Sequence, residues 1–399
     1  MTANPPSPQT AQKPAVRLQS IDALRGFVIV LMLLDHVRET FFLHMQVNDP
    51  MDVTTTAPGL FFSRLLAHLC APIFVFLTGL SAYLYASKYV HSQQAASAFL
   101  FKRGLFLIVL EFTLVNFAWT FSFPPSTIYM QVIWAIGISM VILSVLLWLP
   151  RSILMVLGLI IIAGHNLLDS VHFDESGWMH IPWAVLHDRG WLQVTDGLRM
   201  RTSYPVLPWI GVISLGYSLG PWFGQDVTFA QRQKSLLKLG IALLCSFVAL
   251  RAFNSYGDKP WVEAESSLIS LMGFLNITKY PPSLLFIMLT LGLGLLLLWK
   301  LGRLQDRFQG HLPGALAWLC TFGAAPMFFY LLHLYVLKLM YLTCVSILGK
   351  NQGGTYFGVN SVLSIWLITL VLVSALYWPV KAFARFKAQR RDITWLKYL

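Results

Sequence analysis

The stretch from Leu18 to Met45 limits most strongly what this chain can fold into. It is long enough to cross a lipid bilayer as a helix, which takes about 20 apolar residues at roughly 1.5 Å each. A charge near the bilayer centre costs about 2.5 to 3.5 kcal/mol on insertion scales. A helix that serves only as an anchor would carry few such groups, so this stretch predicts a membrane helix facing a polar interior. Its ionisable side chains are Asp22, Arg25, Asp35, His36, Arg38 and Glu39.

Helical geometry sorts these side chains by depth. Arg25 and His36 are eleven residues apart, which places them on nearly the same face, about 16 Å apart along the axis. Asp22 precedes Arg25 by three residues and is within reach of an ion pair. We expect Arg25 near the cytoplasmic end and His36 near mid-membrane, where an imidazole could take and return a proton. The alternative for Asp22 and Arg25 is a structural ion-pair lattice between packed helices.

The rest of the chain repeats the apolar pattern. Of its 399 residues, 56% are hydrophobic and 12% are charged, a composition typical of a polytopic membrane protein. We therefore predict an all-α fold, a polytopic integral-membrane helical bundle of about ten transmembrane helices. Pro326 should kink or break the ninth span, because a proline removes a backbone donor. The predicted spans are residues 18–45, 60–87, 101–121, 128–149, 152–169, 205–224, 235–253, 281–300, 315–348 and 357–383.

The predicted organisation is a single membrane domain between two tails. Residues 1–17 are expected to form a disordered cytoplasmic tail, residues 18–383 the ten-span domain, and residues 384–399 a basic cytoplasmic tail. Most of the 29 Lys and Arg residues fall in loops on the side of the N-terminus, so both termini are expected in the cytoplasm. The opposite loops, 170–204 and 254–280, are long enough to roof a cavity.

Net charge and cysteine placement exclude two classes of partner. The net charge is +12, but the cations are spread over alternate loops instead of one face, so we expect no nucleic acid. The four cysteines all fall within predicted spans and show no metal-ligand spacing. The sequence leads us to expect a lipid bilayer as the surrounding medium and no metal ion.

Arg103 and Glu111 are candidate groups in the third span. They are eight residues apart and so lie on roughly the same helix face. Arg103 marks the cytoplasmic end of the span, where a cation could clamp a phosphate. Ordinary anchoring at the membrane surface explains the same arginine equally simply.

Two further polar groups interrupt apolar segments. His165, Asn166 and Asp169 lie at the outer end of the fifth span, and His172 follows. They could ligate zinc, but the other ligands of such a site are missing, so a helix cap or contacts with an acceptor sugar are preferred. His333 lies deep in the ninth span, where it either bonds a neighbouring carbonyl or lines a site.

Motifs in a fixed order resemble a known family. The opening S-I-D-A-L-R-G at 20–26, with D-H at 35 and 36, resembles the heparan-α-glucosaminide N-acetyltransferase catalytic-domain family. The Arg25-x10-His36 spacing is also similar to that of the membrane acyltransferase-3 family. Further patches similar to bacterial members of the first family are P-I-F-V-F-L-T-G at 72–79, Q-V-I-W-A-I-G-I-S at 131–139, G-H-N-L-L-D at 164–169, Y-P-V-L-P-W-I-G at 204–211, K-Y-P-P-S-L-L at 279–285 and F-F-Y-L-L-H at 328–333.

The resemblance implies an acyltransferase in the bacterial inner (cytoplasmic) membrane. Acetyl-CoA or another acyl-CoA would be the donor, and an amine or hydroxyl of an envelope glycan or amino sugar the acceptor. His36 would act as base, as transient acyl carrier or as a donor that positions the thioester, with Asp35 orienting it indirectly. Arg25 and Arg103 would bind the donor. Residues expected to contact the acceptor are Glu111, His165, Asn166, Asp169 and His333.

The same assignment leads to expectations about substrate entry and oligomeric state, and it has alternatives. We expect donor to enter from the cytoplasm and acceptor from outside, so that the two meet near His36. The oligomeric state stays open, with a homodimer among the options. A proton-coupled secondary transporter is the alternative, since intramembrane Asp, Glu, Arg and His also build proton relays, although the chain shows no inverted repeat. A sensor or scaffold of envelope assembly would need a soluble module, and no loop is long enough to supply an obvious one.

Overall fold

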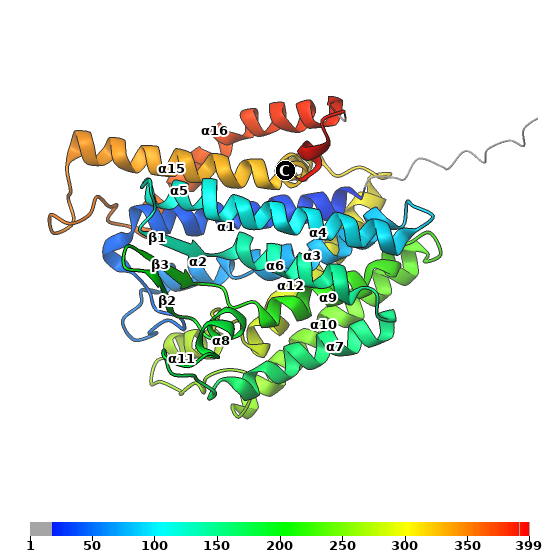
Figure 1. The fold of residues 1–399 in the computed structure, drawn as a ribbon, viewed down its shortest axis with the longest axis horizontal. Coiled ribbons are helices and arrows are strands. Elements are labelled where there is room, and N and C mark those ends of the chain that lie inside the picture. The colour runs from blue at the N-terminus through cyan, green and yellow to red at the C-terminus, as the bar shows by residue number, and fades with distance from the viewer. Residues whose placement is uncertain (1–17, 391, 399) are drawn as a thin grey trace, which may run out of the picture.

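Long apolar helices run side by side in the computed structural model, which describes residues 18–390 and 392–398 (Figure 1). The predicted tail 1–17 lies outside the described residues. Within them, six helical segments are long and apolar enough to cross a membrane. These segments are Pro58–Ala86, Arg151–Leu168, Phe229–Phe253, Leu284–Arg307, Pro326–Leu348 and Val362–Gln389.

The predicted spans correspond to helices in the structure. Each of the ten segments overlaps at least one of α1 Gln19–Phe41, α2 Pro58–Ala67, α3 Cys70–Ala86, α4 Ser92–Leu110, α6 Val132–Leu146, α7 Arg151–Gly164, α9 Leu207–Ser218, α10 Phe229–Phe253, α12 Leu284–Arg307, α15 Pro326–Leu348 and α16 Val362–Gln389. The six long segments do not include α4 or α1, which carries charged side chains. Helices α6 and α9 are apolar but shorter than these six segments. The membrane-bundle architecture is therefore supported, while a count of about ten spans stays a prediction.

Short elements connect these helices. The expected break at Pro326 is confirmed, because α14 ends at Ala324 and Pro326 is the first residue of α15. The last long helix, α16, continues past residue 383 to Gln389. The remaining short helices are η1 Leu43–Met45, η2 Glu111–Val115, α5 Asn116–Thr120, η3 His165–Leu168, α8 His180–Leu186, η4 Gly220–Phe223, α11 Ser267–Leu275, α13 Gly314–Ala317, α14 Leu319–Ala324 and η5 Thr394–Tyr398.

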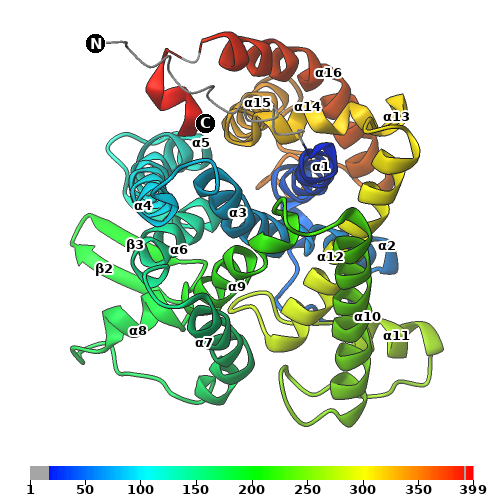
Figure 2. The same cartoon turned by 90° about the vertical axis from the view of Figure 1, so that its right-hand side faces the viewer.

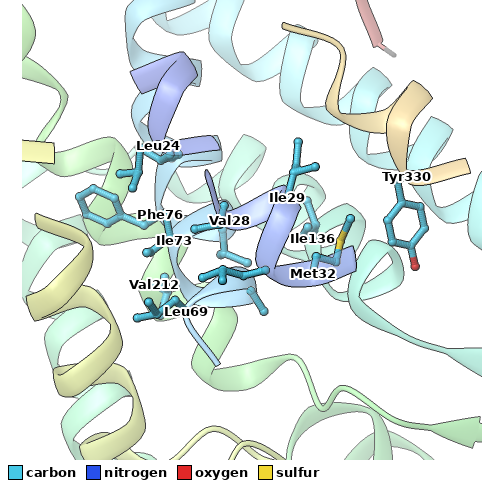
Figure 3. Close-up of a cluster of buried hydrophobic side chains, with 14 of the residues drawn as sticks. Leu24, Val28, Ile29, Met32, Leu69, Ile73, Phe76, Ile136, Val212 and Tyr330 are labelled. Atoms are coloured by element: carbon cyan, nitrogen blue, oxygen red, sulfur yellow. The ribbon is translucent and has the colours of Figure 1, made fainter. Parts of the chain in front are cut away.

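Helix α1 lies at the centre of one half of the bundle. Figure 2, which looks along the helices, shows it surrounded by α3, α12, α14 and α15. Its apolar residues Leu24, Val28 and Met32 pack in a cluster with side chains of α3 such as Ile73 (Figure 3). On its other side α14 approaches closely at Gly323, where a Cβ atom would collide with the Asp22 carbonyl. Glycine lets the two backbones touch, as small residues do between membrane helices.

A small sheet departs from the all-α prediction. Strands β1 Thr127–Met130, β2 Trp191–Thr195 and β3 Leu198–Thr202 pair in the order β1-β3-β2, with β1 parallel and β2 antiparallel to β3. The strands belong to the segments that follow α5 and α8, at the end of the bundle where α1 finishes (Figure 1). Loop backbone needs hydrogen-bond partners, and the strands supply them in segments too short to show a clear alternating pattern.

Candidate active site

A cavity of ≈ 770 Å³ opens inside the bundle beside α1. Its volume is in the range of sites for small molecules and cofactors, about 300–1,000 Å³. Its wall includes His36 of α1 and Arg103 of α4, and extends to Tyr129 of β1 and Arg201 of β3. Residues from both predicted outer loops, such as Arg189 and Lys279, also line it. The expectation that segments 170–204 and 254–280 roof a cavity therefore agrees with the structure.

His36 forms a hydrogen bond with a second histidine. Its Nδ1 lies 2.7 Å from Nε2 of His333, and the two ring planes differ by 11° with centroids 5.0 Å apart. The nitrogens therefore point at each other along the ring planes. His333 Nδ1 lies 2.8 Å from the Phe329 carbonyl oxygen, which can only accept, so this nitrogen donates.

This chain of hydrogen bonds assigns the protons of both neutral rings. With its proton on Nδ1, His333 presents a bare Nε2, and His36 must donate to it from Nδ1. The lone pair of His36 is then on Nε2, the nitrogen that His333 does not occupy. Because His36 lines the cavity, its imidazole is set up to accept a proton there.

Aromatic rings surround His36 on its other sides. The ring of Trp119 meets it edge-on with centroids 5.3 Å apart, and that of Tyr330 lies 6.0 Å away. Both rings also line the cavity. This apolar surrounding restricts water at the imidazole, which strengthens hydrogen bonds made there.

Asp35 belongs to a cluster of cations and does not hydrogen-bond the His36 ring. Its Oδ1 lies 2.8 Å from Arg38 Nη2 and 3.6 Å from Arg64 Nη1, and its Oδ2 lies 3.7 Å from Lys279 Nζ. All four side chains are nearly buried. The geometry therefore gives Asp35 a role in charge balance, because a buried carboxylate needs paired cations, and its indirect orientation of His36 stays a prediction.

The loop that brings Lys279 to Asp35 is fixed by Asp49. The backbone N–H groups of Lys279 and Tyr280 donate to Asp49 Oδ2 at 3.0 and 2.8 Å. Burial disfavours the charge of Lys279, but Tyr280 and Asp35 outweigh it, and the pKa of Lys279 is raised. Lys279 therefore stays cationic at neutral pH. Burial raises the pKa of Asp49, while Arg64 and Lys279 oppose that rise.

Arginines and tyrosines form the part of the wall nearest the sheet. The Arg189 guanidinium lies over the Tyr280 ring, 4.7 Å from its centroid, and the Tyr280 hydroxyl donates to Tyr204 at 3.0 Å. Burial, with repulsion from Arg189, lowers the pKa of Arg201. Two neighbouring guanidinium groups beside flat rings suit a polar, ring-shaped molecule with oxygen acceptors.

The predicted donor-binding arginines differ in position. Arg103 lines the cavity, and its buried Nε has no hydrogen-bond partner among the described residues. Arg25 lies close enough for its charge to act on Arg103, but it is bonded to Asp22 at 3.2 Å and to the Ser81 hydroxyl. The ion pair with Asp22 agrees with the structural alternative for these two residues.

The predicted acceptor-binding residues do not line the cavity. Glu111 is fully buried, and its Oε2 accepts the Trp134 backbone N–H at 3.0 Å, which caps the N-terminus of α6. Asn166 Oδ1 likewise accepts the Leu284 N–H at 2.9 Å, at the start of α12. His165 and Asp169 lie with Asn166 near the end of α7. Of this predicted group only His333 belongs to the site, through its bond to His36.

Several wall residues were not singled out from the sequence. Arg64 offered a signal, since it is a cation inside an apolar segment. Lys279 and Tyr280 begin the K-Y-P-P patch, but nothing in their spacing connects them to Asp35. Arg189 and Arg201 looked like ordinary loop cations.

Comparison with known families gives one match. The family model described as heparan-alpha-glucosaminide N-acetyltransferase, catalytic, matches residues 17–253. The matched region contains His36, Arg103 and Arg189, while Lys279 and His333 follow it. No curated protein matches the chain.

Proposed function

The chain belongs to the heparan-α-glucosaminide N-acetyltransferase catalytic-domain family, and we propose that it transfers an acetyl or other acyl group from acyl-CoA to an amine or hydroxyl of an envelope glycan. The family and the apolar helices indicate a membrane acetyltransferase. The observation that carries the finer proposal is the His36 imidazole in the cavity wall, with its Nδ1 bonded to His333.

The proposed chemistry uses the free nitrogen of His36. As the acceptor oxygen or nitrogen attacks the thioester carbonyl, Nε2 takes its proton. The new C–O or C–N bond forms, the C–S bond breaks, and the proton passes to the departing thiolate of CoA. His333 supports this exchange because its Nε2 accepts from His36 and holds one tautomer.

Three roles were open for His36, and its hydrogen bond to His333 supports two of them. A donor that positions the thioester would need a proton on Nε2, but in the neutral pair that proton is on Nδ1. A base and a transient acyl carrier both need the bare Nε2. We favour the base, because a base, unlike an acyl carrier, requires no covalent intermediate between the acyl group and His36.

The two ends of the cavity suit different substrates. Arg103, with the positive charge of Arg25 nearby, would bind phosphate groups of the donor. Arg189, Arg201 and Tyr280 would contact the acceptor at the opposite end. We propose that the N-terminal side faces the cytoplasm in the bacterial inner membrane, so that acyl-CoA enters there and the glycan from outside.

Purified protein with radiolabelled acetyl-CoA tests the proposal. We expect slow hydrolysis of the thioester without acceptor and transfer of label to amino sugars or glycans when these are added. His36→Ala should lower both by about 10²- to 10⁴-fold. A wild-type protein that neither binds nor cleaves acyl-CoA would refute the proposed function.

Sealed, oriented vesicles test the two-sided arrangement separately. Acyl-CoA is supplied on one face and a membrane-impermeant acceptor on the other. We expect product only when the donor is on the face of the N-terminus and the acceptor is opposite. Product that requires both substrates on one face would contradict this arrangement and leave the acyltransferase assignment intact.

A further inference from the structure

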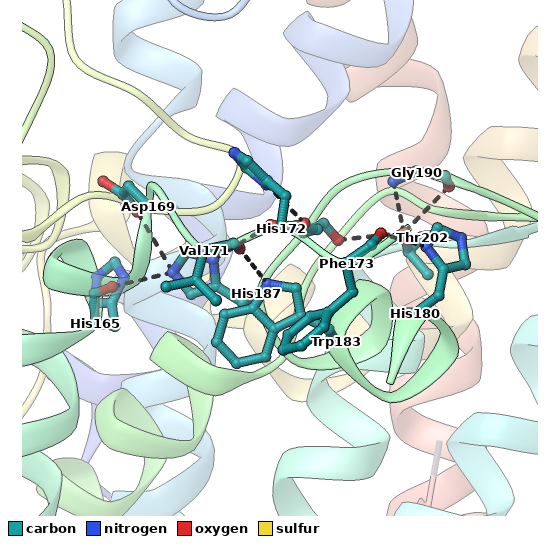
Figure 4. A network of polar contacts seen from close by, with 11 residues as sticks. His165, Asp169, Val171, His172, Phe173, His180, Trp183, His187, Gly190 and Thr202 are labelled. Atoms are coloured by element: carbon teal, nitrogen blue, oxygen red, sulfur yellow. Dashed lines mark hydrogen bonds and ion pairs between the residues drawn. The ribbon is translucent and has the colours of Figure 1, made fainter. Parts of the chain in front are cut away.

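A second cluster of histidines and carboxylates lies outside the cavity, where α7 ends near α8. His165, Asp169 and His187 each present a potential ligand atom, and these atoms lie within 4.8 Å of one another. Figure 4 shows the three residues close together, with dashed lines that join His187 to Asp169 and to the His165 backbone carbonyl. His187 is eighteen residues beyond Asp169 in the chain, so only folding brings it to the cluster.

The histidines of this cluster have unused ring nitrogens. His165 is 2% exposed, and neither of its nitrogens meets hydrogen-bond geometry with any described residue. The Pro282 backbone lies near enough to interact with the ring, but outside the geometry of a hydrogen bond. His187 is 1% exposed, and its Nδ1 is also without a hydrogen bond. Buried polar atoms left unsatisfied are costly and rare, so the two ring nitrogens of His165 call for a ligand.

The separations suit a tetrahedral zinc ion. Two ligands about 2.0–2.1 Å from zinc at the tetrahedral angle are about 3.4 Å apart. His187 Nε2 and Asp169 Oδ1 are 3.4 Å apart. Two imidazoles and one carboxylate form a donor set that zinc accepts, with the fourth position left for water.

An outer carboxylate is also in place. His187 Nδ1 lies 3.5 Å from Asp188 Oδ1, where it could donate its proton once Nε2 binds a metal. Without metal, Nε2 donates instead to the His165 carbonyl at 3.1 Å. Metal binding would therefore shift the His187 proton from Nε2 to Nδ1.

We propose that His165, Asp169 and His187 bind a zinc ion, with Asp188 supporting His187 from outside the coordination shell. This revises the expectation of no metal, which lacked His187 as a ligand. The ion would join the end of α7 to the end of α8. It would also fix the backbone that leads directly into Arg189, which lines the cavity. This positioning of Arg189 rests on the proposed function, whereas the metal site does not.

Metal binding by the purified full-length protein tests the site. After treatment with chelator and addition of zinc, we expect one tightly bound zinc per chain by elemental analysis, and a higher thermal unfolding temperature than without metal. Cobalt in place of zinc should give the intense visible absorption of a tetrahedral site with nitrogen ligands. These readouts do not depend on acyl transfer, so a failure here is separate from a failure of the proposed function.

Variants locate the ion. His165→Ala with His187→Ala should remove zinc binding and the thermal shift, and Asp188→Asn should weaken binding by about 10- to 100-fold. His180→Ala, a histidine of the same segment outside the cluster, should bind zinc like the wild type. Absence of zinc and of any thermal shift in the wild type would overturn the proposal. So would zinc binding that survives the double substitution, because it would show adventitious surface binding.

Discussion

The protein contains two pairs of neighbouring histidines that differ in what their ring nitrogens already bind. His36 and His333 bond each other at 2.7 Å, and the Phe329 backbone carbonyl accepts a hydrogen bond from His333 Nδ1. His165 and His187 have ring centroids 5.9 Å apart and share no ring-to-ring hydrogen bond. The first pair therefore leaves one nitrogen of His36 free at a cavity, as a base requires, while in the second pair both ring nitrogens of His165 are without a hydrogen bond to the described residues.

The carboxylates near the two histidine pairs also differ in what they contact. Asp169 and Asp188 lie directly at His187. Asp35, although adjacent in sequence to His36, is turned to Arg38, Arg64 and Lys279. A carboxylate beside an imidazole favours a charged or metal-bound ring, and this contact is present at His187 but not at His36.

The largest expected effect comes from removing the proposed base, His36. His36→Ala should lower turnover by about 10²- to 10⁴-fold, the usual contribution of general acid–base catalysis. Initial rates of acetyl transfer measure it. The matched control is His91→Ala, at an exposed turn, which should keep wild-type turnover. Wild-type turnover in His36→Ala would remove the functional distinction between the two pairs.

Asp35→Ala should act on stability. It leaves three cations without their shared carboxylate, and breaking a buried ion pair in this way costs about 3–5 kcal/mol. The thermal unfolding temperature and the expression level should both fall. The double variant Asp35→Ala with Lys279→Met should recover part of the loss. If Asp35 instead orients His36, the single variant will fold normally and lose only turnover.

His333→Ala should have a smaller effect on rate. Without its partner, the His36 ring can take either tautomer, and we expect turnover to fall by about 10- to 100-fold, the range found for outer partners of functional histidines. His333→Gln, whose amide oxygen can still accept from Nδ1, should restore part of the rate. A changed pH profile of turnover in His333→Ala would separate loss of the tautomer from simple loss of packing.

The smallest expected effect concerns donor affinity in the cavity that His36 faces. Arg103→Gln should raise the KM for acyl-CoA by about tenfold, because it removes one charge-assisted hydrogen bond, with turnover nearly retained. Arg25→Gln should instead lower expression, since it breaks the contacts with Asp22 and Ser81. An unchanged donor KM in folded Arg103→Gln would contradict a phosphate clamp.

Much of the fold was predictable because the membrane imposes a simple rule. Apolar stretches of sufficient length form helices that satisfy their own backbone, and the break at Pro326 follows from its missing donor. The small sheet was not predictable in this way. Its strands are short, and β1 pairs with β3 across some seventy residues of chain, as Thr127 does with Arg199.

The site residues were predictable from the sequence only where a charged or polar side chain interrupts an apolar segment. The sequence by itself determined that His36 and Arg103 are unusual, because polar groups inside apolar helices are costly to insert. It could not distinguish Glu111, which caps a helix, from a carboxylate that faces a substrate, because both are buried polar groups in the same kind of segment. Only the tertiary structure decided that His333 serves His36, that Lys279 reaches Asp35, and that His187 joins His165. Each of these contacts joins distant parts of the chain, and such contacts depend on how helices and loops pack, which local pattern does not encode.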